Sequence, residues 1–493
     1  MKETYGHITL KRDEQIPVVA DCDVVVIGGG PAGVSAAVSA ARNGCSVTLM
    51  ERYHHLGGMA SGGMVLVLDD MVNDGNEIVT TGIVSEFVDR MAAEDGAVYP
   101  PPEDCLTNWE MWRKWSRWGA IDFHKTGMPQ PIIHAVAFDP DCWKRTSLNL
   151  VREAGVNLRL HSWFSEALVE DGCVTGIICQ TKVGRQAIRA KMVIDASGDL
   201  DVAASAGASF LTGQYIVTTV FRLCDVDTEK AEAFEFEHPE EYKALDRQVR
   251  RVIGGAWGMW WLKTPLPGIV WCNCPHMPGY DGLSPEDMLA AEIEGRERMM
   301  KLLHFVRANL PGFENAKMLG AAEQLGIRQT RLLQGEYVVT RDDVKSRRHF
   351  ADSVCRGRDY YTPYRALLPK GIDNLIVAGR HYSVESEAQK LSREIPPCMA
   401  QGEAAGVAVA VALEQNVALR DADVATIQKR MRARACASAG RSAGRGKASS
   451  RYSQIILDSM TGLPSWTSVG TTPSGFSARY SGRRFSFCDS STW

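Results

Sequence analysis

The feature that most constrains the fold is a glycine-rich turn between an apolar run and a run of small residues. Residues 23–27 (DVVVI) are almost all β-branched and apolar, which is typical of a strand buried on both faces of a parallel sheet. The turn GGGPAG follows at 28–33, and residues 34–44 (VSAAVSAARNG) predict a small-residue helix that ends at a glycine. Residues 46–50 (SVTLM) predict a second strand, so the segment is predicted to form a complete βαβ unit.

The spacing of the glycines predicts a dinucleotide site. Gly28 allows a tight turn, Gly30 lets a pyrophosphate approach the backbone, and Gly33 lets the helix lie close to the sheet. The helix N-terminus offers unpaired amides and the positive end of its dipole to the phosphates. Glu51 follows the second strand, where a carboxylate accepts hydrogen bonds from ribose hydroxyls. The alternative is a glycine-rich turn that only packs within an unrelated α/β core.

Further blocks follow in order along the chain. They are LGGMASGG at 56–63, AKMVIDASGD at 190–199, LGIRQTR and GEY within 325–337, and NLIVAGR, Arg393 and MAQGEAAG within 374–406. The first resembles the extended FAD-binding motif of glutathione-reductase-like flavoproteins. The whole set, which covers about residues 20–430, resembles the FAD-dependent oxidoreductase family and its heterodisulfide reductase A-like and fumarate reductase-like relatives. Ser197 stands where the family usually has Thr.

This resemblance implies an α/β protein with a Rossmann-like FAD-binding domain, an inserted substrate or cap domain, and non-covalent FAD. The closing block implies a strand that ends at Gly379 and a helix that starts near the prolines at 396–397, with the amides of Cys398 and Met399 directed at O2 and N1 of the flavin. The residues assigned to FAD are Gly28, Gly30, Pro31, Ala32, Gly33, Glu51, Arg52, Gly57, Gly58, Met59, Phe164, Ala196, Gly198, Asp199, Gly379, Arg380, Cys398 and Met399.

The positions of these blocks predict a discontinuous organisation. We expect the first part of the FAD-binding domain at 17–215, with an insertion at about 71–134, and a substrate or cap domain at 216–364. The FAD-binding domain closes at 365–428. Residues 429–493 contain 11 Lys/Arg and two acids and are rich in Ser, Gly and Ala, which predicts a flexible basic tail.

The sequence predicts a reaction class but not its chemistry in detail. The resemblance implies a dehydrogenase or reductase that transfers hydride or electrons between flavin and a small organic substrate. Arg328, His381 and Arg393 are the candidates for moving a proton or stabilising charge, because the last two follow the closing strand or precede the closing helix. A structural or FAD-contacting role is the alternative for each of them.

No metal site is expected. The 13 cysteines are scattered and odd in number, so we expect reduced thiols, and Cys272 and Cys274 lack a second cysteine pair to complete a metal or cluster site. A [4Fe-4S] cluster is implied only by the relationship to heterodisulfide reductase A and is not supported by the cysteine spacing. His54-His55 stands differently from the histidine of succinate dehydrogenase, so a covalent flavin is not expected.

Composition limits the partners. With 45% hydrophobic and 23% charged residues and a net charge of −4, the chain is not expected to be disordered, and its net-negative body before residue 429 disfavours nucleic acid. No apolar run is long enough to span a bilayer and no signal peptide is recognisable, so we expect a cytoplasmic location. An electron-transfer partner protein and a homo-oligomer stay open. The alternatives to the oxidoreductase are a heterodisulfide reductase A-like electron-transfer flavoprotein and a non-redox flavin-fold binding protein.

Overall fold

The computed structural model describes residues 14–256 and 259–443, and its centre is a seven-stranded sheet. The order is β6-β2-β1-β9-β8-β7, and β21 pairs with β9 beyond the end of its ladder with β8. The strands are β1 (Val18–Ile27), β2 (Val47–Met50), β6 (Asn157–Arg159), β7 (Trp163–Glu170), β8 (Cys173–Thr181), β9 (Gly184–Asp195) and β21 (Leu375–Val377). Strands β6, β2, β1, β9 and β21 are parallel, whereas β7, β8 and β9 form an antiparallel meander.

The predicted βαβ unit is present. Residues 24–27 of β1 are buried on both faces and pair with β2 on one side and β9 on the other. Helix α1 (Pro31–Arg42) follows the glycine turn and ends two residues before Gly44. The apolar run is therefore a central strand, which is the position where both faces are covered.

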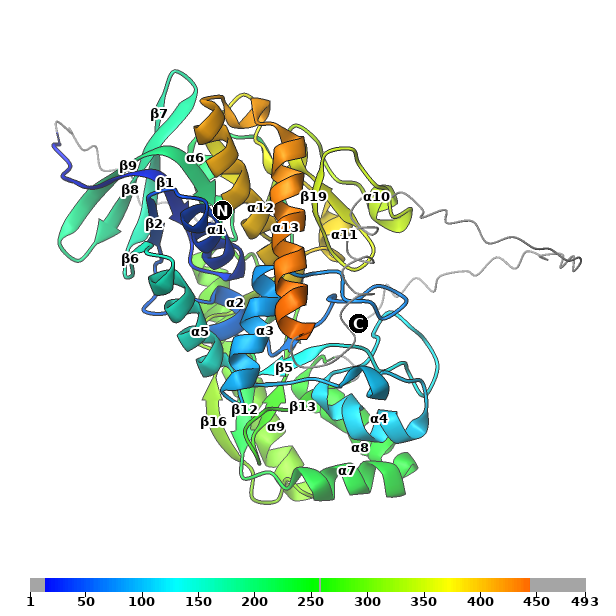
Figure 1. The fold of residues 1–493 in the computed structure, drawn as a ribbon. Helices are drawn as coiled ribbons and strands as arrows, with labels where there is room; N and C mark the ends of the chain where they lie inside the picture. Colours follow the sequence, from blue (N-terminus) through cyan, green and yellow to red (C-terminus); the bar gives the residue numbers. More distant parts are fainter. Residues whose placement is uncertain (1–13, 257–258, 444–493) are drawn as a thin grey trace, which may run out of the picture.

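A layer of helices covers one face of this sheet. Helices α1, α12 (Ile395–Gln415) and α13 (Val424–Ala443) lie side by side in Figure 1. A side chain on Gly402 would place its Cβ 2.0 Å from the carbonyl oxygen of Ala32, and one on Gly406 would lie 2.5 Å from that of Ala36. Glycines on α12 therefore set how closely the two helices approach.

Helix α13 corrects the predicted start of the flexible tail at residue 429. Ile427 and Met431, one helical turn apart, are buried in the main core, and Arg434 donates a hydrogen bond to Ser39 Oγ (2.9 Å). The Ser/Gly/Ala/Arg composition of the whole segment concealed this short i, i+4 apolar pattern. The rest of the predicted tail, residues 444–493, lies outside the described residues.

A second sheet lies at the other end of the molecule, together with helices α7, α8 and α9 (Figure 1). Its antiparallel order is β13-β14-β12-β16, and its core contains Trp260, Trp261, Phe313 and the two thiols of Cys272 and Cys274. The bounds are β12 (Phe221–Cys224), β13 (Trp261–Lys263), β14 (Val270–Cys272), β16 (Lys317–Ala321), α7 (Thr228–Glu237), α8 (Pro239–Ile253) and α9 (Pro285–Asn309). We call this sheet the cap sheet.

The remaining elements complete the fold. The helices are α2 (Gly58–Ser61), α3 (Ile83–Ala93), α4 (Trp109–Trp115), α5 (Pro140–Glu153), α6 (Asp201–Ser205), α10 (Arg341–Lys345) and α11 (Ser386–Gln389). The strands are β3 (Val67–Leu68), β4 (Ala97–Val98), β5 (Val136–Phe138), β10 (Phe210–Thr212), β11 (Val217–Thr218), β15 (His276–Met277), β17 (Gly326–Ile327), β18 (Arg331–Leu333), β19 (Ser353–Arg356) and β20 (Tyr361–Pro363). In the described part of the chain, no helix combines the length and apolar character needed to cross a membrane.

Candidate active site

One large cavity, of about 810 Å³, lies where the carboxyl ends of the parallel strands meet the cap sheet. One wall comes from the ends of β1, β2, β9 and β21. The opposite wall comes from Tyr215, Met259, Leu262, Trp271 and Arg328. The carboxyl edge of a parallel sheet is where α/β proteins bind their ligands, because the connecting loops diverge there. We call the end at the glycine turn the cofactor end and the other the cap end.

The three glycines of the turn have different structural roles. Gly28 has φ +98°, and a Cβ there would lie 2.4 Å from the carbonyl oxygen of Ala196. A Cβ on Gly33 would lie 1.7 Å from the carbonyl oxygen of Gly28. For Gly30, which lines the cavity, the nearest atom to such a Cβ is Gly58 Cα at 3.9 Å. Backbone packing therefore requires glycine at the first and last positions, whereas the middle position opens toward the cavity.

The start of α1 also faces this cavity. Pro31 and Ala32 line the cavity, and Gly30, the N-cap residue, supplies no side chain to cap the helix. Uncapped amides at a helix N-terminus carry partial positive charge and bind phosphate oxygens.

Glu51 lies beside this turn. Its carboxylate accepts hydrogen bonds from the backbone amides of Gly29 (2.6 Å) and Tyr53 (2.9 Å), and the residue lines the cavity. Phe164, at the start of β7, lines the same region. The carboxylate is thus held in one orientation, with lone pairs left to accept from a ligand hydroxyl.

The second glycine block shapes the loop after β2. Gly58 and Met59 line the cavity, but Gly57 does not. Gly57 has φ +111°, donates to the carbonyl oxygen of Gly29 (2.8 Å), and would place a Cβ 2.6 Å from Trp143 Cδ1. Its role in this structure is to dock the loop onto the glycine turn and α5.

The block after β9 gathers charged side chains around Asp199. This carboxylate accepts hydrogen bonds from Thr330 Oγ1 (2.8 Å) and Arg380 (2.9 Å), and Arg52 lies 4.0 Å away. Burial opposes its ionisation, but these arginines and hydrogen bonds keep the pKa of Asp199 below its ordinary value. Ala196, Gly198, Arg52 and Arg380 line the cavity, and Arg380 packs over Gly198.

The closing helix corrects one prediction. Helix α12 begins at Ile395, so the amide of Cys398 already donates to the carbonyl oxygen of Glu394 (3.1 Å) inside the first turn. Met399, the next residue, is fully buried, so of these two residues Cys398 alone lines the cavity. The prediction that the Cys398 amide points at a ligand is therefore wrong, because the helix starts at Ile395 and this amide is used inside its first turn. Gly379 lines the cavity and donates to Gln401 Oε1 (2.9 Å).

The three catalytic candidates all line the cavity, but in different settings. His381 is 1% exposed, and its Nε2 lies 3.2 Å from the backbone oxygen and 3.3 Å from the carboxylate of Asp195. Hydrogen bonds from His381 and Ser197 hold the pKa of the Asp195 carboxyl below its ordinary value, although burial opposes this. His381 is therefore held against Asp195, the last residue of β9, and this favours a structural role for it.

Arg328 and Arg393 lie at the cap end. Arg328 Nη2 is 3.5 Å from His276 Nε2, and Arg393 forms an ion pair with Glu394 (3.2 Å). Burial, together with the like charge of Arg393, lowers the pKa of Arg328 to about 10. Burial also lowers the pKa of His276 to about 3, so this imidazole is neutral. Arg393 thus has an acid partner, and it lines the cavity as well.

Sequence reasoning missed Asp69. It lines the cavity after β3, where burial and the neighbouring carboxylates of Glu394 and Asp70 raise the pKa of Asp69 well above its ordinary value. The signal was the pair of acids that ends the apolar run VLVL at 65–68. A carboxyl with a raised pKa inside a cavity is a candidate for proton transfer.

These features fit a dinucleotide. The long cavity passes from an uncapped helix N-terminus and an open glycine position to a carboxylate at the end of β2. The first two features suit a pyrophosphate, and the carboxylate suits ribose hydroxyls. The family model of FAD-dependent oxidoreductases matches residues 23–361 and 356–431. The comparison with curated protein sequences found no significant match.

Among solved structures, the chain is similar to a geranylgeranyl bacteriochlorophyll reductase-like protein of Thermoplasma acidophilum, with 16% identity and a TM-score of 0.44 over 90% of this chain and 88% of that one. It is also similar to glycine oxidase of Geobacillus kaustophilus (14%, TM-score 0.42, 80% and 95%) and L-proline dehydrogenase of P. horikoshii (16%, TM-score 0.42, 82% and 95%). These similarities are too distant to indicate a substrate. The family model covers most of the sequence, and the chain belongs to the family of FAD-dependent oxidoreductases.

Proposed function

We propose that the cofactor end holds FAD through the glycine turn, the N-terminus of α1 and Glu51, and that the cap end takes a small organic substrate that carries an anionic group. The observation that carries this proposal is the continuity of one cavity from Gly30 to Arg328 and Arg393. FAD, when bound, supplies two-electron redox chemistry. The residues of this chain position the two molecules and handle protons and charge.

Charge at the cap end favours an anion. Two guanidinium groups, of Arg328 and Arg393, lie there, and Arg393 pairs with Glu394. Burial raises the pKa of Asp69 well above its ordinary value, and His276 is neutral. The lowered pKa of Arg328 shows that its surroundings oppose its positive charge. A carboxylate or similar group would relieve this, and guanidinium binds such groups with two parallel hydrogen bonds.

The remaining wall favours an organic body on the substrate. Tyr215, Met259, Leu262 and Trp271 present apolar or aromatic surface opposite the strand ends. Trp271 is fixed by a hydrogen bond from its indole N–H to the backbone oxygen of Met64. Asp69, whose pKa is raised, lines the same cavity and would give or take the proton that accompanies hydride transfer.

The test is anaerobic reduction of the purified, FAD-loaded protein by a panel of small organic acids and their amides. We expect only acids to bleach the flavin absorbance, and Arg328→Met to lower kcat/KM for the best acid about 100-fold, or about 2.7 kcal/mol, at unchanged FAD content. Arg296→Met, on the exposed side of α9, is the matched control. Equal bleaching by acids and amides would contradict the proposal.

Three expectations from the sequence stay predictions: an electron-transfer partner protein, a homo-oligomer and a cytoplasmic location. The domain boundaries at 17–215, 216–364 and 365–428 are likewise proposals. The cap sheet and its helices fall within 216–364, which supports the second of these boundaries.

A further inference from the structure

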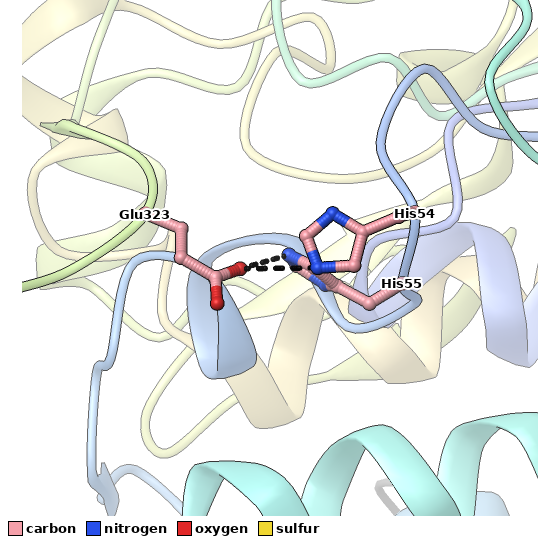
Figure 2. A group of neighbouring side chains, drawn as sticks. All are labelled: His54, His55 and Glu323. Atoms are coloured by element: carbon pink, nitrogen blue, oxygen red, sulfur yellow. Dashed lines mark ion pairs between the residues drawn. The ribbon is translucent and has the colours of Figure 1, made fainter.

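The pair His54-His55 has no role in the proposed function, and neither residue lines the large cavity. Figure 2 shows both imidazoles directed at one carboxylate oxygen of Glu323, which comes from the segment between β16 and β17. His55 Nε2 lies 2.8 Å and His54 Nε2 lies 3.8 Å from Glu323 Oε2. Two nitrogens and one oxygen, all within 4.8 Å of one another, thus converge from two separate segments.

The surroundings of His55 fix which of its ring nitrogens carries the proton. Nδ1 lies 3.3 Å from the backbone oxygen of Leu56 and 3.3 Å from Ser61 Oγ. Ser61 already donates its hydroxyl proton to the same Leu56 oxygen (2.8 Å), so both neighbours of Nδ1 offer acceptors. The proton of the neutral ring therefore belongs on Nδ1, which leaves a lone pair on Nε2.

The lone pair on His55 Nε2 lies close to another acceptor atom, Glu323 Oε2. The side chain of His55 is 6% exposed, and its Nε2 makes no hydrogen bond to any described residue although Glu323 Oε2 is 2.8 Å away. The other oxygen of Glu323, Oε1, pairs with Lys144 (3.1 Å), so Oε2 is the oxygen left to share a cation with His55 Nε2.

We propose that His54, His55 and Glu323 bind a divalent metal ion of the zinc class. Tetrahedral zinc with bonds of 2.0–2.2 Å places its ligand atoms about 3.4 Å apart, and the contacts of 2.8 and 3.8 Å lie on either side of that value. Imidazole nitrogens with one carboxylate suit zinc and disfavour magnesium or calcium. Water completes the coordination, since His54 and Glu323 are partly exposed. The Nδ1 contact to a backbone oxygen is the usual support of a metal-binding histidine. This revises the sequence expectation of no metal site.

The site connects two parts of the wall around the large cavity. The backbone N–H of Gln324, the residue next to Glu323, donates to the backbone oxygen of Gly62 (2.9 Å), and Gln324 lines that cavity. The metal would hold the loop after β2 against the segment that leads to Arg328. A structural role follows, because the ligands lie outside the cavity and cannot reach a substrate there.

The experiment uses the full-length, FAD-loaded protein, stripped of metals with a chelator and titrated with zinc chloride in a calorimeter. We expect one zinc per chain, and at least tenfold weaker binding in His54→Ala and in Glu323→Gln. Both altered side chains are partly exposed, so the fold should persist. His304→Ala, an exposed histidine on α9 outside the cluster, is the control and should bind like the native chain.

Cobalt chloride supplies a second readout, because four-coordinate cobalt with nitrogen and oxygen ligands gives visible absorption that Glu323→Gln should abolish. Flavin absorbance in the same samples reports FAD content, so a failed metal site is distinguishable from a failed flavin site. Absence of stoichiometric zinc binding in the native protein would overturn the proposal. So would equal zinc affinity in the native, His54→Ala and Glu323→Gln proteins.

Discussion

The cofactor end of the cavity is built around one glycine turn, whereas the cap end consists of side chains from several distant segments. Gly28, Gly30 and Gly33 come from one turn, and a methyl group on the first or last would meet a backbone oxygen. Asp69 and Arg328 at the cap end come from loops more than 250 residues apart. The first end has little freedom to vary, whereas the second can change its chemistry one side chain at a time.

The largest effect is expected from Gly33→Ala. Its Cβ would lie 1.7 Å from the carbonyl oxygen of Gly28, and neither backbone can move without separating α1 from β1. We expect a loss of about 3 kcal/mol or more of unfolding free energy, and loss of FAD, measured by urea unfolding and flavin absorbance. Gly44→Ala, where nothing lies within 4 Å, is the control and should cost about 1 kcal/mol through its φ of +93° alone. Equal losses of unfolding free energy in Gly33→Ala and Gly44→Ala would show that the contact with the Gly28 oxygen is not the cause.

Gly30→Val separates binding from folding. The nearest atom to a Cβ there is 3.9 Å away, and φ is −71°, so the FAD-free protein should melt at the native temperature. The added methyl groups enter the cavity where a pyrophosphate must approach, so FAD should bind at least about 100-fold more weakly, or about 2.7 kcal/mol. Native FAD affinity in this variant would show that the turn does not hold the pyrophosphate.

The helix layer behind the cofactor end should be sensitive as well. Met431 of α13 is buried against the main core, so Met431→Ala should cost about 2 kcal/mol, measured by chemical unfolding. Leu289→Ala, at an exposed position of α9, is the control. If Met431→Ala left stability unchanged, the sequence expectation of a dispensable segment from residue 429 would hold after all.

The smallest effect concerns the cap end and depends on pH. Because the pKa of Asp69 is raised in the folded protein, the folded state binds more protons than the unfolded chain above about pH 4. Its contribution to stability is present at low pH and is lost as the pH rises through this window. Asp69→Asn should therefore lose less stability than the native protein between pH 4 and pH 8, measured as the slope of unfolding free energy. Identical slopes would show that Asp69 ionises normally.

The sequence was most informative where function depends on the local path of the backbone. The turn at 28–33, the strand pairing of β1 with β2 and the place of Glu51 follow from residues close together in the chain, because sterics and strand periodicity act over short distances. It was less reliable at helix starts. The prolines at 396–397 indicated a helix, but only the structure shows that α12 begins at Ile395 and thereby uses the Cys398 amide.

By itself, then, the sequence determined that the chain has a dinucleotide-type βαβ unit and the ordered motifs of its family. Tertiary structure alone decided that Asp69 lies near Glu394, which helps to raise its pKa, that Arg393 shares the cap end with Arg328, and that Glu323 reaches His54-His55. The physical reason is the distance along the chain over which each effect acts. Glycine sterics and apolar periodicity are properties of neighbouring residues, whereas pKa shifts and ligand clusters arise from charges and burial that only the folded chain brings together.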